Sequence, residues 1–486
     1  MARVVVLGAG IAGHTAALLL RQKLPHPHEV VVVSPKPTYN WIPSNIWVGV
    51  GMMKPEQVVF ELAPVYRKRR IDFRQARAVE LWPEGGADEP SPHVVVEAVG
   101  ADGAAGERSR VTYDYLVNAT GPRLNFAATP GLGPAANSLS VCTHDHAAQA
   151  AQALRGAIER LRRGDRLTLV VGVGHGTCTC EGAAFEYVFN VDFALRQAGV
   201  RERARLVFIT NEAELGDFGV GGVHIRRGGY RVHSRTFAES LYAERGIEWI
   251  TGAHVQRVEP AVLHYETLDG EEHALPFDFA MLLPPFAGQP IRAFDQAGAD
   301  VTADLFAPSG FMKVDADYTP KPYEAWRASD WPRTYQTPRH RNVFAIGIAF
   351  APPHPISRPL KSKRGTPISP APPRTGMPSA VMARTVAESL YGMIVLGLPG
   401  PTRTASMAEV GASCVASAGA SWFAGSAASM TMFPIVPDYE KYPEFGRDLH
   451  FTYGEIGSAG HWIKKLLHHL FLWKARARPG WWLVPE

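Results

Sequence analysis

Two cysteines lie inside a glycine-rich turn, between a predicted buried strand and a predicted helix. Residues 169–173 are mostly apolar, three alternating glycines follow, and Cys178 and Cys180 come just before a stretch of small and aromatic residues that contains Glu186. The start of a helix offers unpaired N–H groups and the positive end of the helix dipole, which stabilise a thiolate. Thiolates react by exchange with disulfide sulfur atoms. The turn therefore predicts reactive thiol chemistry.

Other interpretations of the cysteines also have to be weighed. A Cys-x-Cys pair could form half of a zinc site, but the remaining two cysteines, Cys142 and Cys414, are far apart in the sequence and form no second pair. We therefore expect no metal. Taken alone, Cys142 could equally be a small buried hydrophobic residue. Four cysteines in 486 residues do not form a disulfide framework and are typical of an intracellular protein.

Candidate proton-transfer groups lie close to two of these cysteines. Glu186 follows Cys180 by less than two helical turns and could act as a general base, or it could be an exposed helix carboxylate. His144, Asp145 and His146 follow Cys142 and could be part of a metal site, a proton relay or ordinary surface polarity. The sequence alone leaves these alternatives open.

A dinucleotide-binding fingerprint opens the chain. Gly8, Gly10 and Gly13 have the spacing G-x-G-x-x-G and lie between an expected strand at 4–7 and an expected helix at 14–22. Such glycines permit a tight turn and bring the helix N-terminus close to a pyrophosphate. The second strand, 30–33, ends in Ser34, Pro35 and Lys36, without the acid that binds an NAD ribose, so FAD is the expected cofactor.

The cysteine turn begins a second unit of the same kind. Residues 165–285 alternate strands and helices, and the strand at 205–210 ends in Thr210 and Asn211, again without an immediate acid. We expect the α/β class, with two tandem Rossmann-like domains and a C-terminal amphipathic membrane-binding region. The expected domains are 1–160 with 335–400, 161–334, and 401–486. The Pro-rich residues 351–378 are expected to be an ordered loop.

The C-terminal region carries an amphipathic pattern. Residues 460–474 place Trp462, Leu467 and Phe471 among apolar residues at helical spacing, with Lys and His side chains opposite. The pattern is typical of a helix at a membrane interface, although packing on the protein's own core or a dimer contact remain alternatives. No segment is long and apolar enough to span a bilayer, and no signal peptide is expected because the first apolar run is a strand. A formal net charge of +4 predicts no nucleic-acid partner.

Several motifs together resemble the sulfide:quinone oxidoreductase family, which belongs with the flavoprotein disulfide reductases, beside flavocytochrome c sulfide dehydrogenase and type II NADH dehydrogenase. Besides the first glycine turn, the resemblance rests on residues 43–51, 140–147, 180–186, 347–349, 374–376 and 412–415. The resemblance covers nearly the whole chain. Three differences stand out: Cys178 is an additional thiol, Arg374 replaces a common Lys, and Asp217 replaces the His of some members.

The resemblance implies roles for individual residues. Cys180 and Cys414 correspond to the redox pair near the flavin, and Cys142 to a third cysteine that is covalently attached to FAD in some members. Glu186 and His146 match positions implicated in proton handling. The expected FAD-binding residues are Gly8, Gly10, Ile11, Ala12, Gly13, Ser34, Pro35, Lys36, Ser44, Asn45, Ala78, Thr120, Gly121, Gly347, Thr375 and Gly376. The candidate quinone-lining residues are Trp462, Leu467 and Phe471.

The resemblance also implies an activity. We expect a peripheral membrane flavoenzyme that oxidises sulfide to zero-valent sulfur or polysulfide through a cysteine pair and reduces a membrane quinone, with a homo-oligomer left open. Two alternatives remain: a type II NADH:quinone oxidoreductase, and a non-catalytic flavin-binding carrier of persulfide. The three cysteines and the missing nucleotide acid argue against the first alternative.

Overall fold

A long sheet forms the upper half of the protein in a computed structural model of the chain, which describes residues 1–100, 103–179, 181–419, 421 and 425–486. In spatial order its strands are β21 (Val343–Ala345), β8 (Tyr115–Asn118), β1 (Arg3–Leu7), β2 (Glu29–Ser34), β5 (Asp72–Trp82), β6 (His93–Val99) and β7 (Ala105–Thr112), and β20 (Arg292–Ala293) pairs with β5. From β21 to β5 the strands are parallel, whereas β6 and β7 are antiparallel. Val4, Val5 and Val6 are fully buried, as expected for a parallel strand covered on both faces.

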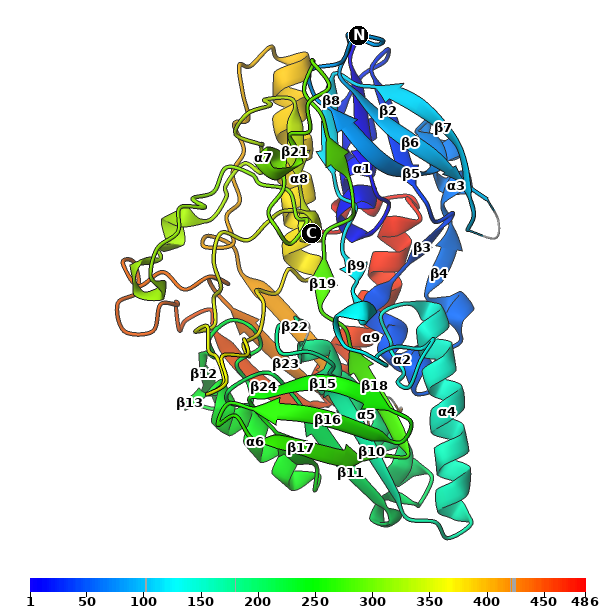
Figure 1. Cartoon of the computed structure of the whole chain (residues 1–486), viewed down its shortest axis with the longest axis vertical. Helices are drawn as coiled ribbons and strands as arrows, with labels where there is room; N and C mark the ends of the chain where they lie inside the picture. Colours follow the sequence, from blue (N-terminus) through cyan, green and yellow to red (C-terminus); the bar gives the residue numbers. More distant parts are fainter. Residues whose placement is uncertain (101–102, 180, 420, 422–424) are drawn as a thin grey trace.

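A second parallel sheet lies in the lower half of the view (Figure 1) and carries the cysteine turn. Its order is β14 (Glu248–Ile250), β11 (Ala204–Ile209), β10 (Leu167–Val173) and β18 (Phe279–Leu283). A three-stranded antiparallel sheet follows, built from β15 (Ala253–Glu259), β16 (Val262–Thr267) and β17 (Glu272–Pro276). Both predicted Rossmann-like units are therefore confirmed.

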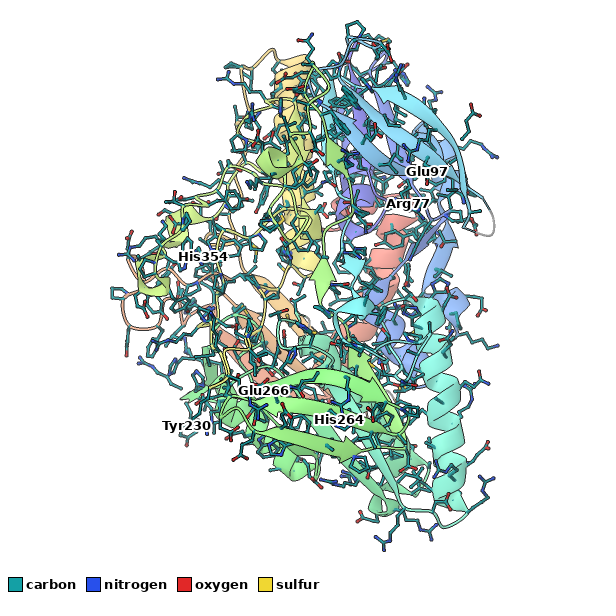
Figure 2. The ribbon with its side chains drawn as sticks, in the orientation of Figure 1. Arg77, Glu97, Tyr230, His264, Glu266 and His354 are labelled. Carbon is teal, nitrogen blue, oxygen red and sulfur yellow. The ribbon has the colours of Figure 1, made fainter. Side chains whose placement is uncertain are left out.

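A mixed sheet joins the C-terminal region to the second unit. Its order is β13 (Tyr230–His233), β12 (His224–Arg227), β24 (Tyr453–Gly457), β23 (Ala427–Met432) and β22 (Ala412–Ser417). Figure 2 shows Tyr230 at the outer edge of this region. Two small ladders, β3 (Thr38–Asn40) with β4 (Val59–Glu61) and β9 (Arg123–Leu124) with β19 (Phe286–Ala287), complete the pairing among the described strands. Cys414 thus belongs to a strand whose sheet also holds second-unit residues.

Nine α-helices are present in the part of the chain that the structure describes. They are α1 (Ile11–Lys23), α2 (Asn45–Gly49), α3 (Leu62–Arg69), α4 (His144–Arg162), α5 (Glu181–Gln197), α6 (Ser234–Glu244), α7 (Thr302–Leu305), α8 (Gly376–Val395) and α9 (Ser458–Ala475). Short 3₁₀ helices used below are η1 (Ile42–Ser44), η7 (Gly347–Ala349) and η8 (Trp481–Leu483). α8 begins three residues earlier than the expected 379, because Pro378 lies in its first turn, where a missing N–H costs no hydrogen bond. No described helix is both long and apolar enough to cross a membrane.

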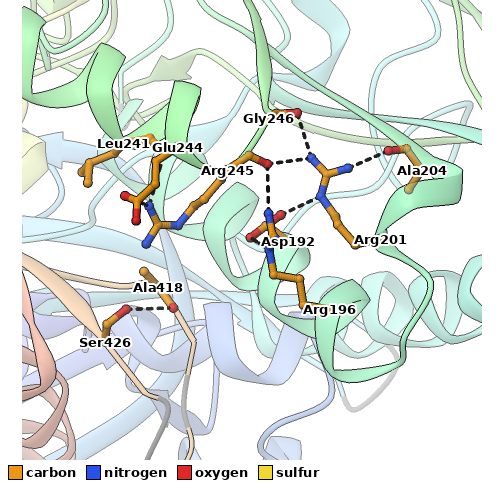
Figure 3. Close-up of polar contacts among 10 residues, drawn as sticks. All are labelled: Asp192, Arg196, Arg201, Ala204, Leu241, Glu244, Arg245, Gly246, Ala418 and Ser426. Carbon is orange, nitrogen blue, oxygen red and sulfur yellow. Dashed lines mark hydrogen bonds and ion pairs between the residues drawn. The ribbon is translucent and has the colours of Figure 1, made fainter.

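Helix α5 is fixed at its C-terminal end by a buried carboxylate. Asp192 accepts hydrogen bonds from Arg196 Nε at 2.9 Å and from Arg201 Nε at 2.6 Å. Arg201 in turn donates to the carbonyl oxygens of Arg245 and Gly246 (Figure 3). These charged hydrogen bonds tie the C-terminal half of α5 to the end of α6.

Candidate functional site

The first glycine turn forms a cradle with one open side. A Cβ at Gly8 would overlap the carbonyl of Ala119, and one at Gly13 would overlap the carbonyl of Gly8, so these glycines allow the turn to pack against β8. Around Gly10, in contrast, no atom of the described residues beyond its chain neighbours lies within 4 Å of a Cβ position. This open side faces the start of α1, which has no acidic residue in its first turn. The cradle therefore fits the pyrophosphate of a dinucleotide.

Most of the other expected FAD-binding residues gather at the same sheet edge. A Cβ on Gly347 would meet Ala12, and one on Gly376 would approach Ile11 within 3.3 Å, so η7 and the start of α8 both adjoin the cradle. Ser34 is the last residue of β2 and Thr120 follows β8, with Thr120 Oγ1 donating to Asn118 Oδ1 at 2.8 Å. Pro35, Lys36 and Gly121 lie beyond these strand ends, and Thr375 precedes α8. Ala78 lies inside β5, three residues beyond Gln75, which pairs with Ser34. This clustering fits FAD.

Arg374 stands where the resembling family commonly has Lys, and its side chain stabilises the segment after β21 at this sheet edge. Its Nη1 donates to the carbonyl oxygens of Ile348 at 3.1 Å and Phe350 at 2.5 Å. The guanidinium also lies 4.5 Å from the centre of the Phe311 ring. Because Ile348 belongs to η7, Arg374 holds the Gly347 segment beside the start of α8.

The second glycine turn is closed. A Cβ at Gly174 would overlap Leu132, and one at Gly176 would overlap Pro367 and His254. Two backbone groups of the Pro-rich segment bind the turn: Ser369 N donates to Gly176 O at 2.8 Å, and Ala371 N donates to Cys178 O at 2.9 Å. Within the described residues, the turn therefore presents the carbonyl oxygens of Gly176 and Cys178 to protein, and no open space lies beside Gly174 or Gly176.

Side chains hold the same Pro-rich segment in place. Thr366 Oγ1 donates to Glu266 Oε2 at 2.8 Å, from the β16 strand whose Glu266 is labelled in Figure 2. Ser357 Oγ donates to Asp217, and Asn211 Nδ2 donates to both Gly176 O and Cys178 O at 3.1 Å. The expected ordered loop at 351–378 is confirmed, and it covers the second turn.

Two buried acids, Glu181 and Glu212, and the partly buried Asp217 lie near this turn, and the sequence expectations missed their role. Glu212 follows β11 three residues after its last residue, and its carboxylate accepts from Phe218 N at 2.6 Å and from Thr210 Oγ1 at 3.0 Å. The sequence analysis expected no acid directly after this strand. This holds for Thr210 and Asn211, but the third residue after β11 is Glu212. Burial and the charge of Asp217 raise the pKa of Glu212 to about 8. Burial, with the charge of Glu212 nearby, also raises the pKa of Glu181 well above its usual range.

Helix α2 connects the segments that carry the predicted redox cysteines. Asn45 Nδ2 donates to Val141 O at 3.2 Å, next to Cys142. Trp47 Nε1 donates to Ser417 Oγ at 2.9 Å, on the Cys414 strand. Tyr187 of α5 donates to Gly49 O at 2.9 Å. Short α2 thus links all three cysteine-bearing segments through buried hydrogen bonds.

Around Cys414, an ion pair forms between α5 and α9. Lys464 Nζ pairs with Glu186 and donates to Val415 O at 2.8 Å, next to Cys414. Burial raises the pKa of Glu186, which Lys464 counteracts. Cys414 is exposed as a residue. The protein around its thiol nevertheless desolvates it, which raises the pKa of the thiol, and the charge of Lys464 opposes this rise. Glu186 is buried, so the exposed-carboxylate alternative is wrong.

Cys142 lies just before α4, on the first unit. Burial raises the pKa of its thiol to about 11, partly offset by Ser140. His146 is half-buried, its ring lies 5.8 Å from that of Phe126, and burial and Lys36 lower its pKa. A neutral His146 close to Cys142 can accept a proton.

The two turn cysteines differ in what can be said of them. Cys178 is fully buried, and its thiol lies 3.2 Å from the carbonyl of Leu283 as a hydrogen-bond donor. Cys180, the predicted reactive cysteine of the turn, lies outside the described residues. Its neighbours Thr179 and Glu181 are both buried.

Helix α9 buries its polar side and exposes much of its apolar side. His461, Lys464, His468 and Lys474 are buried, whereas Trp462, Ile463, Leu466 and Trp473 are exposed. His468 Nδ1 lies 2.9 Å from Ser44 Oγ, and burial lowers the pKa of His468 to about 4. His468 lies on the polar face, as expected, and this face is buried because Lys464 pairs with Glu186 and His468 with Ser44. The alternative that the apolar face packs on the protein's own core does not hold for Trp462, Leu466 and Trp473, and the membrane interface stays a prediction.

Two expected site groups are placed as follows. The Ser44 hydroxyl forms a hydrogen bond with His468 Nδ1. The side-chain amide of Asn45 donates to Asn40 Oδ1 and to Val141 O. Among the candidate quinone residues, Leu467 and Phe471 are half-buried, with Phe471 stacked 5.2 Å from Trp41, while Trp462 faces outward.

An open dinucleotide cradle followed by a second Rossmann-like unit with a thiol at its glycine turn defines the class of two-domain flavoprotein oxidoreductases. Residues 2–284 match the family described as pyridine nucleotide-disulphide oxidoreductase, and the chain belongs to this family. Its members bind FAD, which confirms the expected cofactor.

Comparison with individual proteins confirms the resemblance. The sulfide-quinone reductase of Aquifex aeolicus is 29% identical over 97% of this chain and 91% of its own length. The solved sulfide:quinone oxidoreductase from Aquifex aeolicus gives a TM-score of 0.74 at 28% identity and covers 98% of this chain and 92% of that one. NDH2 from Plasmodium falciparum, solved with NADH, shares the fold alone: 12% identity and a TM-score of 0.62 over 98% of this chain and 96% of that one.

Proposed function

We propose that the chain oxidises sulfide to zero-valent sulfur or polysulfide through Cys180 and Cys414 and passes the electrons through FAD to a membrane quinone. The observation that carries the proposal is the link through α2, which joins the segments of Cys142, Cys180 and Cys414. The full-length similarity to a sulfide-quinone reductase supports the same substrates.

The proposed thiol chemistry balances as an exchange. Hydrosulfide attacks one sulfur of a disulfide between Cys180 and Cys414, the S–S bond breaks, and a persulfide and a thiolate result. Bound FAD supplies the two-electron acceptor that returns the pair to the oxidised state as zero-valent sulfur leaves. Lys464 stabilises the Cys414 thiolate, and Glu186 and His146 exchange the protons. Overall, sulfide loses two electrons and quinone gains two electrons and two protons.

The membrane is reached, in this proposal, by the outward face of α9. Leu466 is 61% exposed, and Trp462 and Trp473 are exposed beside it, as are Trp482 and Leu483 of η8. Apolar side chains with Trp at the boundary suit a bilayer interface. Leu467 and Phe471, on the flank between the buried and exposed faces, would line the quinone path, with Trp462 at its entrance.

Anaerobic spectroscopy of the FAD-loaded protein tests the activity. Sulfide should bleach the flavin absorbance within the turnover time, and NADH should not, because the Pro-rich segment occupies the second glycine turn. Bleaching by NADH at a catalytic rate would favour the type II NADH:quinone alternative. Bleaching by sulfide without reduction of decylubiquinone, in lipid, would favour the persulfide carrier.

A further inference from the structure

We propose that a basic cavity at the junction of α1, α3 and η8 binds the phosphate of an anionic phospholipid. The inference rests on the proposed docking of α9 at a membrane and adds a lipid-specific site to it. The cavity measures about 330 Å³, and the side chains that give it its character are Arg21, His26, Lys68, Arg69, Arg70 and Trp482.

The basic side chains of this cavity have no acidic side chain beside them among the described lining residues. Lys23, on the same helix as Arg21, instead pairs with Glu388 at 3.4 Å outside the cavity. Burial and the charge of Arg70 lower the pKa of Arg21, so these two cations repel each other. A phosphate placed between them would relieve this repulsion.

The fold itself sets the cations in place. Arg21 Nη1 donates to His28 O at 2.7 Å, and Arg69 donates to Ala477 O while lying 5.9 Å from the centre of the Trp481 ring. Arg69 Nε is buried and has no hydrogen-bond partner among the described residues. Lys68 and Arg70 are exposed at the end of α3, where Arg70 has a left-handed φ of 55°. Two fixed and two adjustable cations therefore surround the space.

The cavity is continuous with the apolar face of the C-terminal region. Trp482 lines it and is 47% exposed, and the adjoining Leu483 is 78% exposed. Arg478 lies 5.3 Å from the centre of the exposed Trp473 ring, so cations and apolar side chains alternate towards α9. If Leu483 and Trp482 enter the acyl region, the four cations lie at headgroup depth. This geometry favours a lipid phosphate over a free one.

Vesicle co-sedimentation of the FAD-loaded protein tests the site. Phosphatidylcholine vesicles are compared with vesicles that also contain phosphatidylglycerol. The double variant Lys68→Gln with Arg70→Gln should lose about thirtyfold in affinity for the mixed vesicles, since each basic side chain near an anionic surface contributes about a factor of five. Its binding to phosphatidylcholine and its bleaching by sulfide should be unchanged.

The matched control removes two charges elsewhere. Arg162→Gln with Arg163→Gln changes exposed arginines at the end of α4, which Figure 1 shows at the lower end of the molecule, and should keep wild-type affinity. An equal loss in both double variants, or no loss in the first, overturns the headgroup site. Displacement of the wild type by inorganic phosphate beyond that by sodium chloride of equal ionic strength would overturn the lipid assignment. Failure of the wild type to bind either vesicle overturns the membrane docking itself.

Discussion

The two glycine turns of this protein start from the same local structure and end in opposite states. Both follow a buried parallel strand and precede a helix, at residues 8–10 and at residues 174–179. The first turn is open at Gly10, whereas the second is covered by backbone groups of Ser369 and Ala371. The strand–turn–helix unit alone therefore does not decide whether a turn binds a nucleotide.

What separates the turns is a distant segment. Residues 351–378 leave β21 and η7 of the first unit and cross to the second turn before α8 begins. The hydrogen bonds of Glu266 and Asp217 to Thr366 and Ser357 fix this crossing. A segment that follows the first unit's strand therefore covers the glycine turn of the other unit.

The largest expected effect tests the thiol side of this comparison. Cys180→Ser and Cys414→Ser should each abolish sulfide-dependent quinone reduction while FAD content remains at the wild-type level, because in the proposed mechanism the first turn binds the cofactor and the two thiols perform the exchange. Steady-state turnover and the flavin-to-protein absorbance ratio measure the two separately. Turnover by Cys414→Ser above a few per cent of wild type would contradict the pairing.

A matched pair of substitutions tests the cofactor side. Gly8→Ala should destabilise the protein by about 2–5 kcal/mol, because Gly8 has a φ of 99° and its Cβ would overlap Ala119. Gly10→Ala should leave the melting temperature of the FAD-free protein unchanged and lower only FAD affinity, since the space beside Gly10 is open. Unaltered FAD affinity in Gly10→Ala would argue that the cofactor does not approach there.

The ion pair between α5 and α9 provides a pH-dependent test. Lys464→Met leaves Glu186 buried without its partner and should cost about 3–5 kcal/mol near neutral pH. Burial already raises the pKa of Glu186, and loss of Lys464 raises it further. A raised carboxyl pKa contributes stability at low pH that is lost as pH rises through the folded-state value.

Denaturant unfolding across pH measures this effect. The deficit of Lys464→Met relative to wild type should therefore grow from pH 5 to pH 8. Lys465→Met, on the neighbouring position of α9 and only half-buried, is the control and should show little pH dependence. A deficit that shrinks with rising pH would show that Glu186 is not the group left uncompensated.

Local patterns predicted the framework because strand burial and glycine spacing are short-range properties. The strands at 4–7 and 30–33 and the glycine fingerprint are all found in β1, β2 and α1. The covering of the second turn could not be predicted, since proline spacing marks a loop without saying where it packs. The links from Asn45, Trp47 and Gly49 span 96, 370 and 138 residues, beyond any local pattern.

The burial of the polar side of α9 could not be predicted for a different reason. Helical periodicity separates two faces but does not say which one is buried, so core packing and a membrane interface both remained open. His461, Lys464 and His468 have the i, i+3, i+7 spacing of a single face, so an ordered polar stripe was visible in the sequence. Its burial depends on Glu186 and Ser44, which come from distant elements.

Cys178→Ser should have the smallest effect and decides which turn cysteine is redundant. The Cys178 thiol is fully buried and donates to Leu283 O, a bond that a serine hydroxyl can also make, so stability should change by less than about 1 kcal/mol. Turnover should stay near the wild-type rate, because the Cys178 side chain and carbonyl are both engaged in holding the covered turn. If Cys178→Ser is inactive and Cys180→Ser active, the reactive thiol lies two residues earlier, and the covered turn itself carries the chemistry.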